Sequence, residues 1–263
     1  MHAQIVLFDG FDPLDVVAPF EVLHAGGTAS GGSVTVELVS AEGAREVVSG
    51  TGGLTLRATA ALDPERADLV LVPGASGRVS ESEDGPEEVF GEAGVGVPGT
   101  QPAEGGAGPG VQPAQGGAAP AEGGAAPAEV ADQPVPVLIG RTLTTRLPAL
   151  LRAAMDDPSV TVATVCGGSL VLALAGLLEG RHATTHHLGL DLLDATGAHA
   201  VRARVVDDGD LVTGAGVTSG LDLALHLLER EAGPRIAHAV EELFAHERRG
   251  TVWRDRGPAP AAL

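Results

Sequence analysis

Two spacings of hydrophobic residues alternate along this chain and predict its secondary structure. Runs of consecutive or alternating apolar residues, which are typical of strands, occupy residues 4–8, 34–39, 54–57, 68–72, 160–165, 182–185, 203–206 and 211–213. Apolar residues at helical spacing occupy residues 14–25, 147–155, 168–178, 218–231 and 236–246. Strands that alternate with helices predict an α/β fold, in which helices cover both faces of a mainly parallel, flavodoxin-like sheet.

One long segment breaks this pattern. Residues 91–136 contain no aromatic residue, no Leu or Ile and no basic residue, and the hexapeptide Pro-Ala-Glu-Gly-Gly-Ala occurs at 102–107 and again at 120–125. Such a segment buries too little apolar surface to offset the entropy of ordering it. The sequence therefore predicts one domain, built from residues 1–90 and 137–250, with a disordered insertion at 91–136 and a flexible tail at 251–263.

Composition narrows the classes of partner. Sixteen basic against thirty-five acidic residues give a net charge of −19, and every basic residue is an arginine. This charge repels phosphate backbones and anionic lipid surfaces, so we expect no nucleic-acid partner and no membrane partner. No basic leader followed by a long apolar run is visible, and the single cysteine fits a reducing compartment. The expectation is a cytoplasmic protein.

The one cysteine stands where a parallel α/β sheet presents its reactive groups. The β-branched run 160–165 leads directly into Cys166, Gly167 and Gly168, after which a helix is predicted. Small residues allow a sharp turn from strand to helix, and N–H groups at the helix start are expected to favour a thiolate and lower its pKa. The alternative, from local sequence alone, is that Cys166 is a small and unreactive core residue.

Four motifs, in this order, resemble the ThiJ/PfpI superfamily, which has the class I glutamine-amidotransferase-like fold. They are Asp-Pro-Leu-Asp-Val-Val-Ala-Pro-Phe-Glu-Val-Leu at 12–23, Leu-Val-Pro-Gly-Ala at 71–75, Val-Cys-Gly-Gly-Ser at 165–169 and Gly-Arg-His-Ala-Thr-Thr-His at 180–186. The resemblance covers residues 3–75 and 137–248. It is strongest toward isonitrile-hydratase-like members and the sensor domains of AraC-type regulators.

The resemblance implies a role for several matching positions. Cys166 matches the nucleophile, and Asp15 matches an acidic residue whose carboxyl group approaches the sulfur and handles protons. The backbone at Gly74 and Ala75, together with the N–H of Gly167, matches the oxyanion site. Without the resemblance, Asp15 would be interpreted as an acid favoured by the helix dipole, and Gly74 as part of a simple turn.

A histidine and three departures complete the comparison with the family pattern. His186 matches a histidine that several branches place near the nucleophile, and a Cys–His pair is a known activation device. Gly167 stands where isonitrile-hydratase-like sequences often have a threonine whose hydroxyl is implicated in the chemistry. Ala75 replaces a second glycine, and His187 replaces the aromatic residue that usually follows the histidine.

The sequence lacks the motifs of other kinds of site. His182, His186 and His187 cluster, but no Cys-x-x-Cys or His-Glu-x-x-His spacing supports them, so no metal site is expected. No glycine-rich phosphate loop stands at a strand–helix junction, and no cofactor is expected. A glutamine amidotransferase would need a late His-x-Glu pair, whereas His238 and Glu241 have a different spacing.

Three functions remain open at this point. The leading hypothesis is a cysteine-dependent hydratase or hydrolase that acts on a small C–N electrophile, as isonitrile hydratases do. A glyoxalase or deglycase acting on α-oxoaldehydes would depend more on His186. A non-catalytic domain that senses a ligand or an oxidant is the third. The resemblance also implies a homodimer with a small-molecule substrate.

Overall fold

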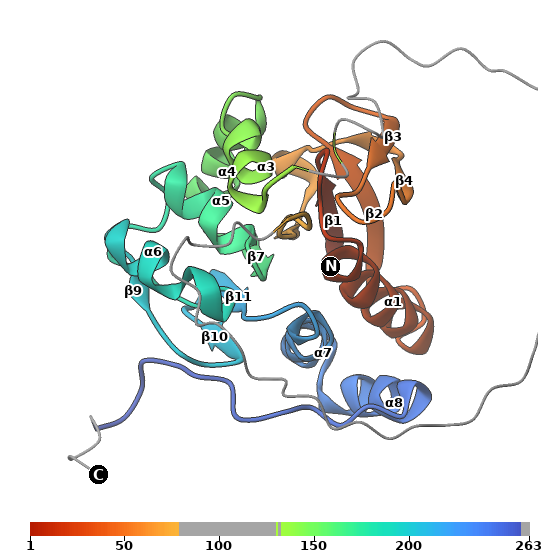
Figure 1. Cartoon of the computed structure of the whole chain (residues 1–263). Helices are drawn as coiled ribbons and strands as arrows, with labels where there is room; N and C mark the ends of the chain where they lie inside the picture. The colour runs from red at the N-terminus through yellow and green to blue at the C-terminus, as the bar shows by residue number, and fades with distance from the viewer. Residues whose placement is uncertain (79–129, 131–132, 259–263) are drawn as a thin grey trace, which may run out of the picture. The chain divides into compact units, whose positions relative to one another are not determined.

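The computed structural model describes residues 1–78, 130 and 133–258 (Figure 1). Seven strands form one sheet in the order β10-β11-β7-β6-β1-β2-β5. Every neighbouring pair is parallel except β10 with β11. The strands are β1 (His2–Leu7), β2 (Thr35–Ser40), β5 (Ala60–Ala61), β6 (Leu69–Val72), β7 (Thr161–Val165), β10 (Val205–Asp207) and β11 (Leu211–Gly214).

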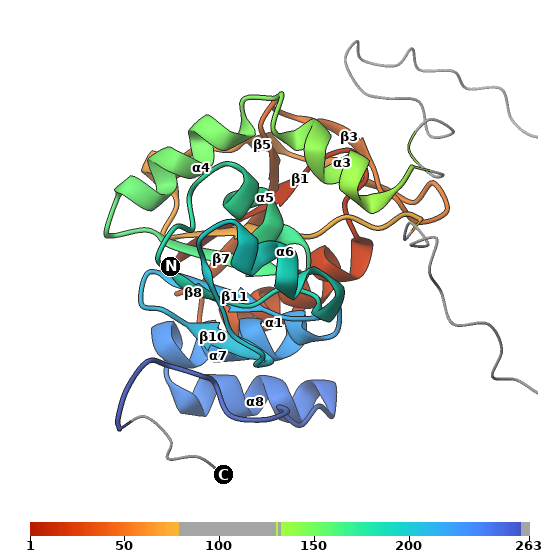
Figure 2. The same cartoon turned by 60° about the vertical axis from the view of Figure 1, so that its left-hand side comes forward.

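Helices cover both faces of this sheet, as Figures 1 and 2 show. On one face α1 (Pro13–Ala29), α7 (Ser219–Ala232) and α8 (Pro234–Phe244) pack against one another. On the other lie α3 (Val135–Thr142), α4 (Leu147–Asp156), α5 (Gly168–Leu174) and α6 (Leu190–Ala195). The α/β class with a mainly parallel sheet, predicted from the spacing of apolar residues, is confirmed.

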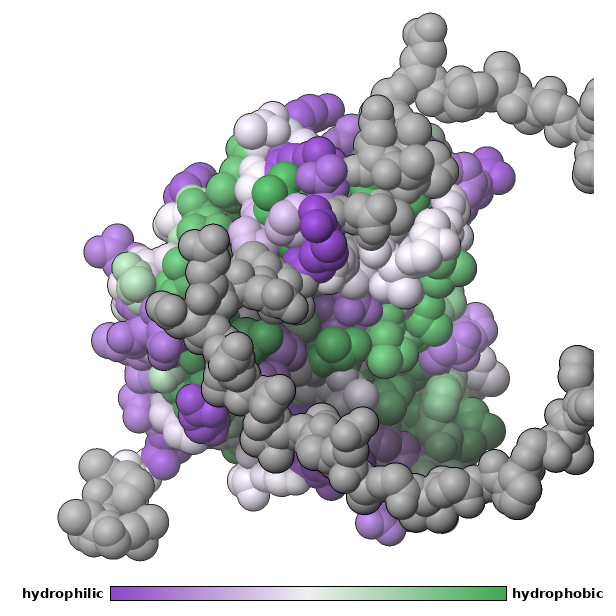
Figure 3. Space-filling view, in the orientation of Figure 1, coloured by the Kyte–Doolittle hydropathy of each residue, from purple (hydrophilic) through white to green (hydrophobic). Residues whose placement is uncertain are grey.

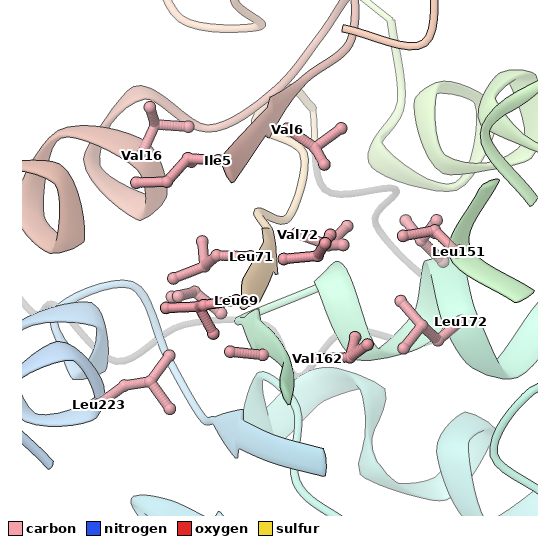
Figure 4. Packing of buried hydrophobic residues seen from close by; sticks show 14 of the residues in the cluster. Ile5, Val6, Val16, Leu69, Leu71, Val72, Leu151, Val162, Leu172 and Leu223 are labelled. Carbon is pink, nitrogen blue, oxygen red and sulfur yellow. The ribbon is translucent and has the colours of Figure 1, made fainter. Parts of the chain in front are cut away.

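The central strand β6 explains why this sheet needs cover on both sides. Its four residues are all fully buried, and successive side chains of a strand point to opposite faces. In Figure 4, Leu69 and Leu71 point toward Leu223 of α7, whereas Val72 points toward Leu151 of α4. A continuous aliphatic strand therefore builds two hydrophobic layers, one under each group of helices.

A β-hairpin lies beside the sheet, and the spacing of apolar residues predicted only one of its two strands. Its strands are β3 (Arg45–Val48) and β4 (Thr55–Ala58), of which the sequence analysis predicted only the second. Gly10 donates its N–H to the carbonyl of Val48 at 2.8 Å and so ties the hairpin to the loop after β1. β3 is short and begins with two charged residues, which hides its strand character in the sequence.

The predicted domain boundaries need two corrections. Most of the predicted insertion lies outside the described residues, but α3 already begins at Val135, inside the range assigned to it. The backbone of Arg78 pairs there with Gln133 and Val135, through N–H···O distances of 3.1 and 3.0 Å. Local composition missed this because Val135 gains its order from a partner far away in the sequence.

The first part of the predicted flexible tail is also held in place. Trp253 donates its N–H to the carbonyl of Val205, and its own carbonyl accepts from Asp207, both at 2.9 Å. The guanidinium of Arg254 binds the carboxylate of Asp207 at 2.9 and 3.0 Å. These contacts extend the outer edge of β10, which a composition argument cannot anticipate.

The described helices lack the features of membrane-spanning segments. None of those within 1–78 and 133–258 combines the length and apolar character needed to cross a bilayer. Hydrophobic residues nevertheless reach the surface between hydrophilic ones, as Figure 3 shows for one face. Leu14 and Val17 of α1, for example, are 46% and 38% exposed.

Candidate active site

Cys166 lies on a tight turn between β7 and α5. Its φ angle is +54°, in the left-handed region that residues with a Cβ rarely adopt. Gly168 makes the turn possible, because a Cβ there would lie 2.2 Å from the carbonyl oxygen of Val72. The cysteine N–H donates to the carbonyl of Gly214 at 3.0 Å. The strand–cysteine–helix arrangement predicted from the local sequence is therefore present, with the thiol at the carboxyl end of the sheet.

Asp15 is brought to the same place by the start of α1. Asp12 caps this helix by accepting the N–H of Leu14 at 2.9 Å, and its own N–H donates to the carbonyl of Gly74 at 2.9 Å. Asp15, one turn later, is fully buried, and its Oδ2 accepts the N–H of Gly74 at 2.9 Å. Within the described part of the chain, its Oδ1 has no hydrogen-bond partner.

Burial dominates the electrostatics of the Asp15–Cys166 pair. It raises the pKa of Asp15 well above the ordinary value, and the charge of Asp12 raises it further, against the lowering effect of the Gly74 N–H and the thiol. Burial also raises the pKa of Cys166, and the charge of Asp15 adds to this. Each group acts on the other, so the two titrate as a coupled pair in which both protons are held more tightly than usual.

This result corrects the expected activation of the thiol. The sequence predicted that N–H groups at the helix start would lower the pKa of Cys166. The N–H of Gly167 does act in that direction, but burial and Asp15 outweigh it. Cys166 is only 7% exposed, and α5 has only seven residues. A thiolate at Cys166 therefore forms more readily when Asp15 is protonated and uncharged, and the helix dipole alone does not stabilise it.

The oxyanion donors also need a correction. The family pattern pointed to Gly74, but the N–H of Gly74 already donates to Asp15, 59 residues away in the sequence. The N–H of Ala75 meets no acceptor within the described ranges. It lies 3.8 Å from the position that a Cβ on Gly167 would take. Of the three positions that the resemblance implied, Ala75 and Gly167 therefore remain the predicted donor pair.

His186 is bonded to a neighbouring residue and not to Cys166. Among the residues that the structure describes, no hydrogen bond joins it to Cys166; its Nδ1 accepts the N–H of Leu188 at 3.4 Å. Burial and the neighbouring His187 lower the pKa of His186, so its ring is neutral at neutral pH. A neutral ring can accept a proton, but without a hydrogen bond to the sulfur it is not a preformed base for Cys166, and the base role assigned to His186 stays a prediction.

Two residues at the site were missed by the sequence analysis. Ile139 of α3 is 2% exposed and places its Cδ1 3.3 Å from a Cβ built on Gly167, so it covers the turn after Cys166. It falls just after the low-complexity segment, where no helix was predicted. Thr185 donates its hydroxyl to the carbonyl of Cys166 at 2.7 Å. It lies inside the fourth motif, but nothing in its spacing points to this contact.

The histidine cluster is engaged elsewhere. His182 packs its ring on Trp253 and His199, with centroids 5.0 and 4.9 Å apart, and lies 3.5 Å from Asp208. His186 and His187 pack against each other at 4.2 Å. In the described ranges, no group of three or more potential ligands is arranged to hold a metal ion.

Replacing Asp12 by asparagine tests the electrostatics of the pair. Asparagine caps a helix as well as aspartate, so α1 should keep its start while the charge that raises both pKa values disappears. We expect iodoacetamide to alkylate Cys166 about three-fold faster or more at pH 8, because loss of this charge lowers the pKa of the thiol and raises the thiolate fraction. Cys166 is the single thiol of the chain, so uptake is specific.

The matched control is Asp63→Asn. Asp63 caps the short helix η1 (Pro64–Arg66) in the same way, by accepting the N–H of Glu65 at 3.2 Å. Its charge is not among the causes of the raised pKa of Cys166. Equal alkylation rates in Asp12→Asn and Asp63→Asn would show that the charge of Asp12 does not reach the thiol.

Part of this chain is similar to proteins of a known family. Residues 140–230 match the DJ-1/PfpI family. An isonitrile hydratase from Pseudomonas putida is 51% identical over 80 residues, which cover 30% of this chain and 35% of that protein. The HTH-type transcriptional regulator CdhR from Pseudomonas aeruginosa is 38% identical over 106 residues, or 40% of this chain and 31% of the regulator. The chain thus spans about a third of the length of the curated relatives it matches.

A solved structure supports the fold over a longer range. A ThiJ/PfpI family protein from Pseudomonas syringae superposes with a TM-score of 0.59 at 20% sequence identity. The match covers 95% of this chain and 76% of the other. At this identity the likeness concerns the fold, and the chemistry has to be argued from the residues themselves.

Proposed function

Because this chain is a member of the ThiJ/PfpI superfamily, we propose that it is a hydratase that uses Cys166 as a nucleophile on a small C–N electrophile, an isonitrile in the first instance. One observation carries the proposal: a buried carboxyl, Asp15, interacts with the only thiol at a strained turn. The similarity to an isonitrile hydratase supports the choice of substrate.

The first half of the reaction starts from the form of the pair in which Asp15 holds its proton and Cys166 is the thiolate. Asp15 gives its proton to the terminal carbon of R–N≡C, and the sulfur of Cys166 forms a bond to the same carbon. The product is a thioimidate, Cys–S–CH=N–R, beside an ionised Asp15. The raised pKa of Asp15 suits this step, since a carboxyl that holds its proton at neutral pH can act as a general acid.

The second half consumes water. Asp15 takes one proton from a water molecule while the oxygen of that water bonds to the thioimidate carbon. Asp15 then passes the proton to the nitrogen. The C–S bond then breaks, a C=O bond forms, and the hydroxyl proton returns to Asp15. The balance is R–NC plus water to R–NH–CHO, with the thiolate of Cys166 and the protonated carboxyl of Asp15 restored. The N–H groups of Ala75 and Gly167 are the donors for the developing oxygen charge.

A substrate panel tests this assignment. The protein is incubated with a small alkyl isonitrile, a small amide and methylglyoxal, and the formamide, the carboxylic acid and lactate are measured. Formamide production supports the proposal. Lactate without formamide would instead establish the glyoxalase alternative. Binding of an isonitrile without any product would indicate a ligand-sensing domain, which the burial of Cys166 and the similarity to a regulator favour.

Gly167→Thr tests whether the missing hydroxyl limits this chain. Gly167 has φ −67°, an ordinary helical value. A Cβ there would meet the flexible end of Ile139 at 3.3 Å, and backbone atoms of Gly74 and Ala75 at the ordinary contact distances of 3.5 and 3.8 Å. The variant should therefore fold, with a melting temperature close to that of the wild type. We expect it to hydrate the isonitrile about ten-fold faster, the size of effect that one added polar group gives. Slower turnover in a folded variant would contradict this expectation.

A further inference from the structure

The backbone of Cys166 is held at both of its polar groups by elements outside the turn. Its N–H donates to the carbonyl of Gly214, at the end of β11, at 3.0 Å. Its carbonyl accepts the hydroxyl of Thr185 at 2.7 Å. Because φ is +54° and the residue has a Cβ, the conformation is strained and persists only where its surroundings impose it. The two hydrogen bonds are such a constraint.

Thr185 is well placed to act on this turn. It is 1% exposed and follows β8 (His182–Ala183), in the segment that leads to His186. The preceding residue, Thr184, donates its N–H to the hydroxyl of Thr213 on β11 at 2.8 Å, which fixes the segment against the sheet. The hydroxyl of Thr185 therefore comes from a rigid support, and its short bond to a buried carbonyl leaves that carbonyl little freedom.

We propose that Thr185 is a positioning residue for Cys166, whose hydroxyl fixes the left-handed turn and so aims the sulfur at the N–H of Gly167 and the carboxyl of Asp15. Without this hydroxyl the carbonyl of Cys166 is buried and unpaired, and the turn relaxes toward an unstrained conformation. The sulfur then loses its contact with the N–H of Gly167. Because this N–H lowers the pKa of the thiol, its loss raises that pKa. This proposal rests on the proposed function, because it concerns the same thiol.

The neighbouring threonine provides a matched control. Thr184 is also 1% exposed, and its hydroxyl donates to a backbone carbonyl, that of Ala203, at 3.1 Å. That carbonyl is not part of the turn at Cys166. Thr184→Val and Thr185→Val therefore remove the same group from equally buried positions one residue apart. A purely structural role of both hydroxyls predicts the same outcome for both variants.

The experiment measures alkylation of Cys166 by iodoacetamide from pH 7 to pH 10, at a temperature well below the melting point of each variant. In Thr185→Val we expect the rate to fall at least about ten-fold at each pH, because a thiolate without a donor forms less readily. Thr184→Val should stay within about two-fold of the wild type. Thr185→Ser keeps the hydroxyl and should restore the wild-type profile.

Each outcome decides something. Equal profiles for Thr185→Val and Thr184→Val, or faster alkylation in Thr185→Val, would overturn the positioning role. If valine prevents folding at position 185, Thr185→Ala removes the hydroxyl without the added methyl group and is judged by the same profile. Alkylation needs no substrate, so a profile that depends on Thr185 in a protein that turns over no isonitrile would sink the proposed function and keep this inference.

Discussion

Replacing Cys166 by serine should reduce isonitrile hydration by at least about 10³-fold, because removal of a nucleophile that acts with a coupled acid disables the whole unit. A serine hydroxyl is far less acidic than a thiol, and Asp15 is too weak a base to ionise it. The formamide produced per minute at saturating isonitrile is the measurement, made on wild type and variant at equal concentrations of folded protein.

Stability separates this loss from misfolding. Serine is close to cysteine in size and stays at the same turn, so its melting temperature should differ little from that of the wild type. Ser159→Ala, on an exposed turn where the serine hydroxyl donates to the side chain of Asp157, serves as a control for handling. Formamide production above about a tenth of the wild-type rate in a folded Cys166→Ser protein would rule out the sulfur as nucleophile.

Asp15→Asn should lower turnover by about 10²- to 10³-fold, the usual worth of a general acid–base group. Asparagine has the same shape, and its carbonyl oxygen can still accept the N–H of Gly74. It carries no transferable proton, however, so neither the first protonation nor the activation of water is supported. Above the pKa of Asp15 the same change also removes the negative charge beside the sulfur, so alkylation of Cys166 should become faster there while turnover becomes slower.

The same variant should change how stability depends on pH. Burial raises the pKa of Asp15 in the folded protein above its value of 3.8 in the unfolded chain, so the folded state holds the proton more tightly. As pH rises from there through the folded-state pKa, the wild type loses stability relative to Asp15→Asn, by about 1.4 kcal/mol for each unit between the two pKa values. Urea unfolding at a series of pH values measures this; parallel curves would contradict a buried, protonated Asp15.

The local sequence predicted the turn at Cys166, but it did not predict the pKa of the thiol. A β-branched run followed directly by Cys166 and two glycines is enough to predict a strand–cysteine–helix turn. The burial that raises the thiol pKa comes from other parts of the chain, including Ile139, whose contact with the turn has no local signal. The expected thiolate was therefore wrong, although the position of the cysteine was right.

Contacts between residues far apart in the sequence also determine which backbone and side-chain groups remain free to bind a substrate. The Gly74 N–H was expected to face a substrate, yet the side chain of Asp15 takes it, and only the fold brings these two residues together. Thr185 stood in a recognised motif without a role, because its partner is a backbone carbonyl that carries no side-chain signature. Trp253 and Arg254 were placed in a flexible tail because their partners, Val205 and Asp207 on β10, lie far away in the sequence.

The mass of the protein during turnover tests the role of Cys166 most directly. Wild-type protein mixed with excess alkyl isonitrile and quenched in acid should gain the mass of one whole isonitrile, on the peptide that contains Cys166. The adduct should disappear as the formamide accumulates and should be absent in Cys166→Ser. Formamide produced with no adduct at any time, or with equal speed in the serine variant, would contradict a covalent reaction at this sulfur.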